Sequence, residues 1–176
     1  MKEQVKNTDK KGIFKITDLA TYVCSKYFNS YKKEISSIKL QKTLYFLFAY
    51  WGGFVRKNND NSNYVEEKID LNEKLFDCNF EAWVYGPVIP EIFRKFRDNK
   101  LDYVNFDSSE MFDGVDSMVK ESIDSLLDEL FEISDFKLVS VSHEDSCWKQ
   151  YFNVHESNHN RIIPSEEIIE EYAIKQ

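Results

Sequence analysis

The stretch LFDCNFEAWVYGPVIPEIFRKFR, residues Leu75–Arg97, holds two of the three prolines, one of the five glycines and one of the three tryptophans in this 176-residue chain. The aromatic residues of Phe80–Tyr85 favour a short extended run, and Gly86–Pro87 is typical of a turn. Pro90 suits the first position of a helix, because its fixed backbone angle is already helical. That helix would place three apolar side chains on one face: Ile92, Phe93 and Phe96. The stretch therefore predicts a strand, a corner and a helix in succession.

Two segments outside this stretch have apolar residues at the spacing of an amphipathic helix. The first has Ser36 or Ser37 as N-cap and Gly52–Gly53 as its expected end. Its apolar stripe is Leu40, Leu44, Leu47, Phe48 and Trp51. The second spans Asp116–Phe131. Its stripe is Val119, Ile123, Leu126, Leu127 and Leu130.

Other segments give weaker signals. Thr17 is a candidate N-cap for a first helix that ends near Phe28, after a flexible lead over Met1–Lys15. The Asn-rich segment Lys57–Asn63 is typical of an exposed loop. Apolar residues in Asp98–Gly114 predict that this segment lies against the core. Phe136–Val141 is ambiguous, because its β-branched residues favour strand whereas Ser134 is suited to cap a helix.

Length and composition predict a single domain over residues 16–176 with an aromatic core, since aromatic residues make up 15% of the chain. The net charge of −8, without a dominant basic run, argues against nucleic acid as a partner and favours a basic protein partner. The polar residues 1–12 have no apolar core of the signal-peptide type, and no apolar run is long enough to span a membrane. We expect a soluble cytoplasmic protein with no membrane partner.

The sequence offers no assembled catalytic or metal-binding motif, so we expect neither an enzyme nor a bound cofactor or metal. Cys24, Cys78 and Cys147 have no disulfide or zinc-site spacing and resemble small core residues more than nucleophiles. His155 and His159 have a spacing that could bind metal, but their surroundings resemble a loop without a third ligand. Phosphate-binding glycine motifs are absent.

His143 and Glu144 are the pair that most invites a catalytic interpretation. Sequence adjacency does not bring a general base within hydrogen-bonding distance of its partner. We therefore expect a structural or partner-contacting role, in which His143 or Glu144 bonds backbone near the Gly86–Pro87 corner and Trp148 packs over that corner. Trp83 is expected to be buried, whereas an exposed Tyr85 or Arg94 would suit an interaction surface.

Three blocks of the sequence together resemble the Panacea antitoxin domain, also called SocA-like and found in phage-associated GepA-type proteins. They are Lys39–Phe46 (KLQKTLYF), the corner from Leu75 to Pro90, and the His143–Trp148 segment. The resemblance extends from about Asp18 to Tyr172. The chain departs from the family at Ser146–Cys147, where a proline usually precedes Trp148, and in a polar insertion over Asn58–Asn72.

The resemblance implies a mainly α-helical, bundle-like domain with a minor extended element over Trp83–Pro90, and it favours helix for Phe136–Val141. It also implies an antitoxin that neutralises a cognate toxin by direct contact. The family's motif positions here are Trp83, Tyr85, Gly86, Pro87, Pro90, Arg94, His143, Glu144 and Trp148. We expect no added DNA-binding domain. Two alternatives remain open, a phage-encoded inhibitor of a host defence or host enzyme, and an adaptor that delivers a bound toxin to a protease.

Overall fold

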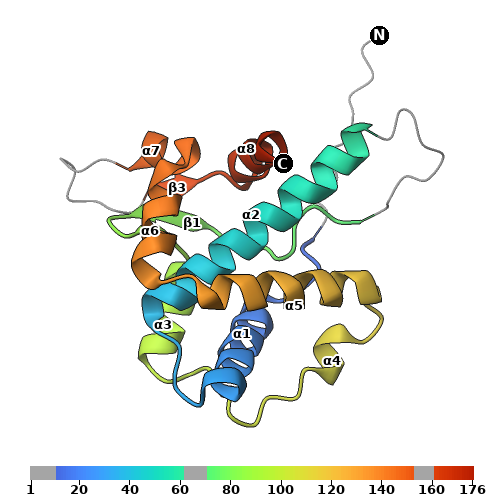
Figure 1. The fold of residues 1–176 in the computed structure, drawn as a ribbon, viewed down its shortest axis with the longest axis vertical. Helices are drawn as coiled ribbons and strands as arrows, with labels where there is room; N and C mark the ends of the chain where they lie inside the picture. The colour runs from blue at the N-terminus through green and yellow to red at the C-terminus, as the bar shows by residue number, and fades with distance from the viewer. Residues whose placement is uncertain (1–10, 62–70, 153–160) are drawn as a thin grey trace.

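Helix α2 (Ser37–Asn61) lies at the centre of the fold, and the other elements pack around it (Figure 1). A computed structural model describes residues 11–61, 71–152 and 161–176. In these residues the other helices are α1 (Ile16–Tyr31), α3 (Pro90–Arg97), α4 (Ser109–Phe112), α5 (Ser117–Glu132), α6 (Asp135–Glu144), α7 (Ser146–Tyr151) and α8 (Ser165–Lys175). Strands β1 (Phe80–Trp83), β2 (Gly86–Val88) and β3 (Ile162–Ile163) form a small antiparallel sheet in the order β2-β1-β3. The predicted mainly helical fold with a minor extended element is confirmed.

The core is built around a segment of α2 that is buried on every side. All residues from Lys39 to Ala49 are buried, including the large side chains of Tyr45, Phe46 and Phe48. Helices α5, α6 and α8 and the hairpin of β1 and β2 all contact α2. Burial of this aromatic surface is the main favourable term that holds the elements together.

Several helices begin where the sequence predicts, at a capping residue or a proline. Ser36 Oγ accepts a hydrogen bond from the Lys39 N–H at 2.9 Å, which identifies Ser36 as the cap of α2. Asp116 caps α5 by accepting from the Met118 N–H at 2.8 Å. Pro90 opens α3, as expected. Phe136–Val141 lies within α6, whose cap is Ser134, so the helical alternative for this segment is confirmed.

The N-cap predicted at Thr17 is wrong, since α1 already begins at Ile16 and its N-cap is Lys15. Thr17 lies inside the first turn, where its Oγ1 accepts a hydrogen bond from Lys95 Nζ at 3.0 Å. The helix begins earlier because the preceding chain is held in place. Phe14 donates its N–H to the Leu75 carbonyl at 2.9 Å, and it is buried although it lies in the segment predicted as a lead.

The helix end predicted at Gly52–Gly53 is also wrong, because α2 continues to Asn61. Both glycines face α8. A Cβ at Gly53 would lie 2.5 Å from the Tyr172 carbonyl carbon, and one at Gly52 would lie 2.6 Å from Ile169 Cγ1. These glycines allow two helix backbones to approach closely, at the cost of some helix propensity.

The loop predicted over Lys57–Asn63 is wrong for residues 57–61, which are helical, whereas residues 62 and 63 lie outside the described residues. The predicted packing of Asp98–Gly114 against the core is confirmed by Leu101, which is buried, and by Tyr103, Phe106 and Phe112, which are partly buried against it. Short helix α4 lies in this segment.

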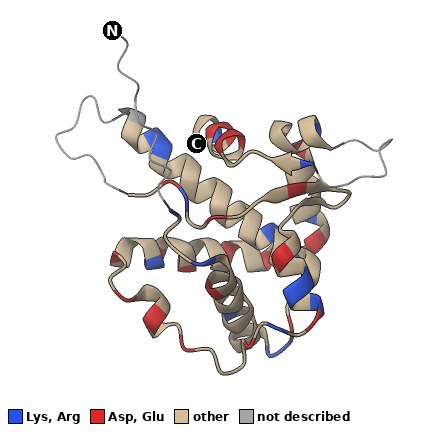
Figure 2. Cartoon of the chain, turned by 180° about the vertical axis from the view of Figure 1, so that it is seen from behind, with Lys and Arg blue, Asp and Glu red and all other residues tan. Residues whose placement is uncertain are grey.

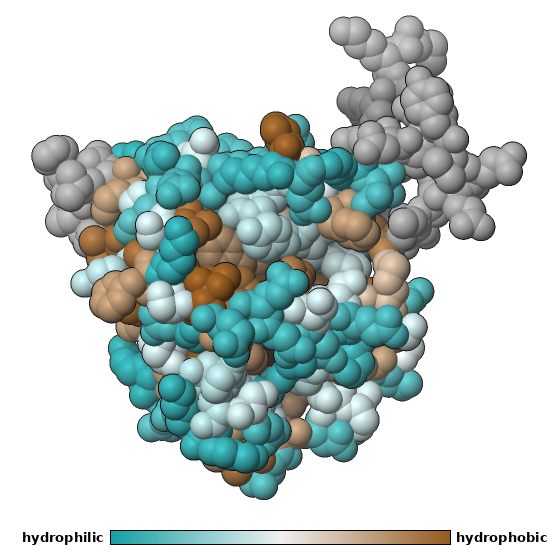
Figure 3. All heavy atoms as spheres, viewed as in Figure 1, coloured by the Kyte–Doolittle hydropathy of each residue, from teal (hydrophilic) through white to brown (hydrophobic). Residues whose placement is uncertain are grey.

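Charged residues are spread over the molecule, whereas exposed hydrophobic residues gather in one area of the face shown in Figure 1. Lys, Arg, Asp and Glu are interspersed over the ribbon, and neither sign covers one side (Figure 2). Hydrophobic side chains on the face of Figure 1 collect in a hollow bordered by hydrophilic ones (Figure 3). A groove of about 450 Å³ between α2 and α5 is lined by aromatic and apolar residues that include Tyr50, Phe54 and Leu126. No helix in the described part of the chain combines the length and apolarity needed to cross a bilayer.

Candidate functional site

The hairpin of β1 and β2 forms the centre of the candidate site. Trp83 pairs with Gly86, which leaves Val84 and Tyr85 as a two-residue turn at the tip. The predicted turn at Gly86–Pro87 is therefore displaced, since these residues belong to β2 and the chain reverses just before them. The side chains at the tip are exposed, 47% for Val84 and 60% for Tyr85.

Gly86 has a conformation and surroundings that require glycine. Its φ angle is +93°, a backbone region that side-chain-bearing residues rarely adopt. A Cβ at this position would also lie 2.3 Å from Ser142 Oγ and 3.0 Å from Lys42 Nζ. The hairpin thus lies directly against α2 and α6, and this contact fixes its position.

Lys42 is the buried cation beneath this contact. Its side chain is 1% exposed, and its Nζ donates a hydrogen bond to the Pro87 carbonyl oxygen. Burial lowers the pKa of Lys42 to about 7, because removal from water disfavours the charged form. The amine therefore supports the backbone of β2 at a position where most lysines would face solvent.

Other polar residues of the same helical block fasten further parts of the chain to α2. Lys39 Nζ donates to the carbonyl oxygens of Phe131, at 3.0 Å, and Ile133, and so satisfies acceptors at the end of α5. Gln41 Oε1 accepts the N–H of Ile89 at 2.8 Å, just before α3 begins. The buried polar side chains of this block thus bond the backbone around both α5 and the hairpin.

The His143–Trp148 segment supports the hairpin from α6 and α7. The His143 ring stacks on Trp148 with centroids 4.1 Å apart and planes at 13°. Trp148 Nε1 donates to the Trp83 carbonyl oxygen at 3.0 Å. The predicted packing of Trp148 over the corner is therefore confirmed. Burial also lowers the pKa of His143, which favours the neutral imidazole.

Asp145, between α6 and α7, anchors this segment to the core. Its Oδ2 accepts hydrogen bonds from the Tyr45 hydroxyl at 2.6 Å and the Tyr172 hydroxyl at 2.9 Å. Its Oδ1 accepts from Lys175 Nζ at 2.6 Å. The carboxylate is 1% exposed, so these bonds replace the water that it loses on folding.

Ser146 and Cys147, directly before Trp148, bind helix α8 through their backbone. The N–H groups of Ser146 and Cys147 donate to the Glu171 carboxylate at 2.8 Å and 2.9 Å. A proline at either position would lack this donor. Burial alone would raise the pKa of Glu171, but hydrogen bonds from Lys175 and from these N–H groups outweigh it and lower the pKa to about 2.

The predicted site residues divide into a buried support and an exposed surface. Gly86, Pro87 and Trp148 are buried. The expected burial of Trp83 is wrong, since this residue is only half-buried and its indole donates to the Glu81 side chain. Pro90 begins α3. The exposed residues of the set are Tyr85, Arg94 and Glu144. Of the pair His143 and Glu144, the structure directs His143 against Trp148, whereas the Glu144 side chain is exposed.

A small pocket of about 80 Å³ lies beside the hairpin tip. Residues of α2, the hairpin and α3 line it: Ser37, Ile38, Gln41, Lys42, Trp83, Val84, Tyr85, Val88 and Phe93. Its size suits an apolar side chain more than a cofactor. The tip therefore combines an exposed aromatic ring, Tyr85, with an adjacent pocket that could accept a side chain of a partner.

The cysteine and histidine candidates form no reactive arrangement in the described residues. Burial raises the pKa of the Cys24 and Cys147 thiols to about 12 and raises that of Cys78 as well, which disfavours a nucleophilic thiolate. His155 and His159 lie outside the described residues. Within the described ranges, no group of three or more His, Cys, Asp or Glu is arranged to hold a metal ion.

Sequence reasoning missed Lys42, Ser142 and Asp145 as members of the site. Lys42 lies within the KLQKTLYF block, but nothing local shows that its partner is the carbonyl of Pro87. Gln41, Lys42 and Thr43 lie between the stripe residues Leu40 and Leu44, where an amphipathic helix normally faces solvent. Their burial results from packing on every side of α2, which the local sequence does not indicate.

Part of the chain is similar to a known family. Residues 63–149 match the family model described as "Antitoxin SocA-like, Panacea domain". The match includes the hairpin, α3, α5, α6 and the Trp148 segment. Neither the curated proteins nor the solved structures gave a match to the chain.

Proposed function

We propose that this chain, which belongs to the SocA-like Panacea domain family through residues 63–149, neutralises a cognate toxin by direct protein contact. The family match carries the proposal, because it gives an antitoxin-type role to the part of the chain that contains the hairpin. The setting we propose is a bacterial or prophage toxin–antitoxin pair in the cytoplasm.

The exposed hairpin tip is the surface that we assign to the toxin. Tyr85 is 60% exposed beside the small apolar pocket, and aromatic residues are enriched at the energetic centres of protein interfaces. The backbone beneath it is held by Lys42 and Trp148. A rigid support reduces the entropy lost when a partner orders the tip, and so favours affinity.

We further propose that protection needs no catalysis by this chain. Buried thiols with raised pKa values and a His143 ring stacked on Trp148 support a structural role for these groups. The test is a set of His143→Ala, Glu144→Ala and single Cys→Ala variants. A general acid or base contributes about 10²–10⁴-fold to rate. A folded, toxin-binding variant from this set that no longer protects would contradict the non-enzymatic proposal.

The direct test of function uses the gene next to the one that encodes this chain. Coexpression should restore growth to cells that express the neighbouring toxin, and the two proteins should copurify. Absence of both results with an active toxin would contradict the antitoxin proposal. Copurification with a host enzyme, without protection from any neighbouring toxin, would instead support the phage-encoded inhibitor.

A protease adaptor predicts a different time course. Under that alternative the toxin would disappear in cells that express this chain, and its loss would require the protease. Under direct neutralisation, the toxin level stays constant while growth recovers. Immunoblotting of the toxin during rescue therefore separates the two mechanisms.

A further inference from the structure

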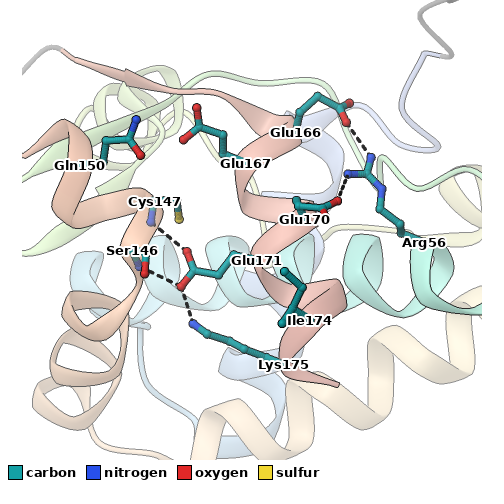
Figure 4. A pocket seen from close by; sticks show the side chains of 10 residues that line it. All are labelled: Arg56, Ser146, Cys147, Gln150, Glu166, Glu167, Glu170, Glu171, Ile174 and Lys175. Carbon is teal, nitrogen blue, oxygen red and sulfur yellow. Dashed lines mark hydrogen bonds and ion pairs between the residues drawn. The ribbon is translucent and has the colours of Figure 1, made fainter. Parts of the chain in front are cut away.

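A groove of about 820 Å³ lies between α7 and α8, away from the residues assigned to the hairpin site (Figure 4). Helix α7 contributes Ser146, Cys147 and Gln150, and α2 contributes Arg56. Helix α8 supplies the remaining lining residues, four glutamates followed by Ile174 and Lys175. The groove is large enough to receive several side chains of a partner.

The lining of the groove is mainly apolar in spite of its glutamates. Ile174 is 78% exposed and adds its apolar side chain to this lining. An apolar lining with an exposed isoleucine favours burial under another chain, since this removes carbon surface from water.

The charges around the groove are not balanced. Arg56 pairs with Glu166 at 2.6 Å, Glu170 at 3.3 Å and Glu73 at 2.7 Å. Lys175 pairs with Glu171 at 2.8 Å and Asp145 at 2.6 Å.

Glu167 adds another carboxylate, which accepts a hydrogen bond from the Tyr151 hydroxyl at 2.6 Å. Among the described residues that line the groove or pair with its lining, six carboxylates thus share two cations. This site therefore has a net charge of −4, half of the −8 of the whole chain.

We propose that this groove docks a basic segment of a protein partner. An apolar side chain of the segment packs on the groove lining beside Ile174. Its lysine or arginine side chains approach Glu166, Glu167 and Glu170, of which Arg56 pairs with Glu166 and Glu170. Complementary charge of this kind selects the partner and accelerates its encounter with the groove.

Existing bonds of the glutamates favour side-chain cations over a bare metal ion. Glu171 already accepts two backbone N–H groups and Lys175, and Glu167 accepts the Tyr151 hydroxyl. A metal ion would have to displace these donors. Long cationic side chains with apolar stems instead match both the apolar lining and the acidic margin.

The inference extends the proposed function by giving the chemistry of the partner, and it uses a surface other than the hairpin tip. The test requires no toxin. The probe is a 14-residue amphipathic peptide of Leu and Lys, with a Leu and Glu peptide as its control. Titration into the ¹⁵N-labelled full chain should shift the amide signals of Ser146, Cys147, Gln150 and Ile174 with the Lys peptide alone.

Two charge-matched double variants locate the binding. Glu166→Gln/Glu170→Gln removes two groove charges but retains acceptors for Arg56, and it should weaken binding of the Lys peptide by about tenfold. Glu121→Gln/Glu129→Gln removes two exposed charges from α5 and should change affinity by less than about twofold. Ile174→Ser should also weaken binding, with an unchanged melting temperature.

Three results would overturn the inference: no shift at the four amides, an equal loss of affinity in both double variants, or equally tight binding of spermidine at the same amides. Failure of this inference is distinguishable from failure of the proposed function. A toxin that copurifies while the peptide does not bind would contradict the groove alone. A peptide that binds while no toxin is neutralised would contradict the antitoxin role alone.

Discussion

Trp148 Nε1 donates a hydrogen bond to the carbonyl oxygen of Trp83 at 3.0 Å, and this bond joins two motif blocks that lie 65 residues apart. The Trp148 ring stacks on the His143 ring, with centroids 4.1 Å apart, and on the Phe152 ring, with centroids 4.6 Å apart. The acceptor lies at the last residue of β1, directly before the exposed tip. This bond therefore adds a contact from α7 to those from α2 and α6 that hold the hairpin.

Replacing Trp148 with Phe should lower the free energy of unfolding by about 1–3 kcal/mol, because the Trp83 carbonyl loses the indole N–H as a donor in a partly buried environment. Urea denaturation measures the change. Trp83→Phe is the matched control, since its indole donates to the Glu81 side chain, which can turn toward water. Equal effects of the two variants would show that the interblock bond adds nothing specific.

Gly86→Ala should destabilise the protein by about 1–3 kcal/mol through its positive φ angle and the added Cβ beside Ser142. Gly114→Ala separates these causes, because Gly114 has a φ of +70° but nothing within 4 Å of an added Cβ. It should therefore cost less than Gly86→Ala. Thermal melting of the two variants provides the comparison, and equal melting temperatures would refute close packing at Gly86.

Gly53→Ala should destabilise the protein, although helix propensity alone would give a gain of about 1 kcal/mol. The reason is the backbone of α8, since an added Cβ would lie 2.5 Å from the Tyr172 carbonyl carbon and 2.8 Å from the Ala173 nitrogen. Gly52→Ala should cost less, because its nearest neighbour is the Ile169 side chain. Chemical denaturation that shows a more stable Gly53→Ala protein would contradict the close crossing of α2 and α8.

Lys42 should make stability depend on pH. Its pKa is about 7 when folded and 10.5 ordinarily, so the unfolded chain binds more protons between these values. The free energy of unfolding then rises with pH in this window, by up to about 1.4 kcal/mol per pH unit, and this dependence vanishes below pH 7. In the opposite sense, the raised pKa values of the thiols reduce stability as the pH approaches and passes their ordinary value of 9.0.

Lys42→Met tests this dependence between pH 7 and pH 8.5. Wild-type protein should gain stability over this range relative to the variant, which has no amine to titrate. Both proteins retain the same cysteines, so their contribution cancels in the difference. A constant difference in unfolding free energy across the range would show that Lys42 keeps an ordinary pKa.

Elements with local signals were predictable from the sequence. The start of α3 follows from Pro90 and its apolar face, and α5 follows from a repeating apolar stripe. Gly52 and Gly53 misled the prediction of the end of α2, because a glycine pair signals a helix end locally. Their actual partner is α8, more than 100 residues further along the chain.

Only those parts of the candidate site that have a local sequence signal could be predicted. Trp83 to Pro87 and Trp148 could be predicted as members of the site, because they lie in short segments rich in aromatic residues, glycine or proline. Its buried polar members depend on distant partners, as Lys42 with Pro87 and Tyr45 with Asp145 show. A lysine that bonds a carbonyl 45 residues away has the same sequence signal as one that faces solvent.

The affinity of the Tyr85→Ala protein for the purified toxin shows whether the hairpin tip contacts the toxin. Calorimetric titration should show binding at least about tenfold weaker than wild type, with an unchanged melting temperature, because truncating an aromatic anchor removes interface energy without disturbing the core. Phe136→Ala, at another exposed aromatic residue, should bind within about twofold of wild type. Wild-type affinity in a folded Tyr85→Ala protein would contradict the assignment of the tip as the toxin-binding surface.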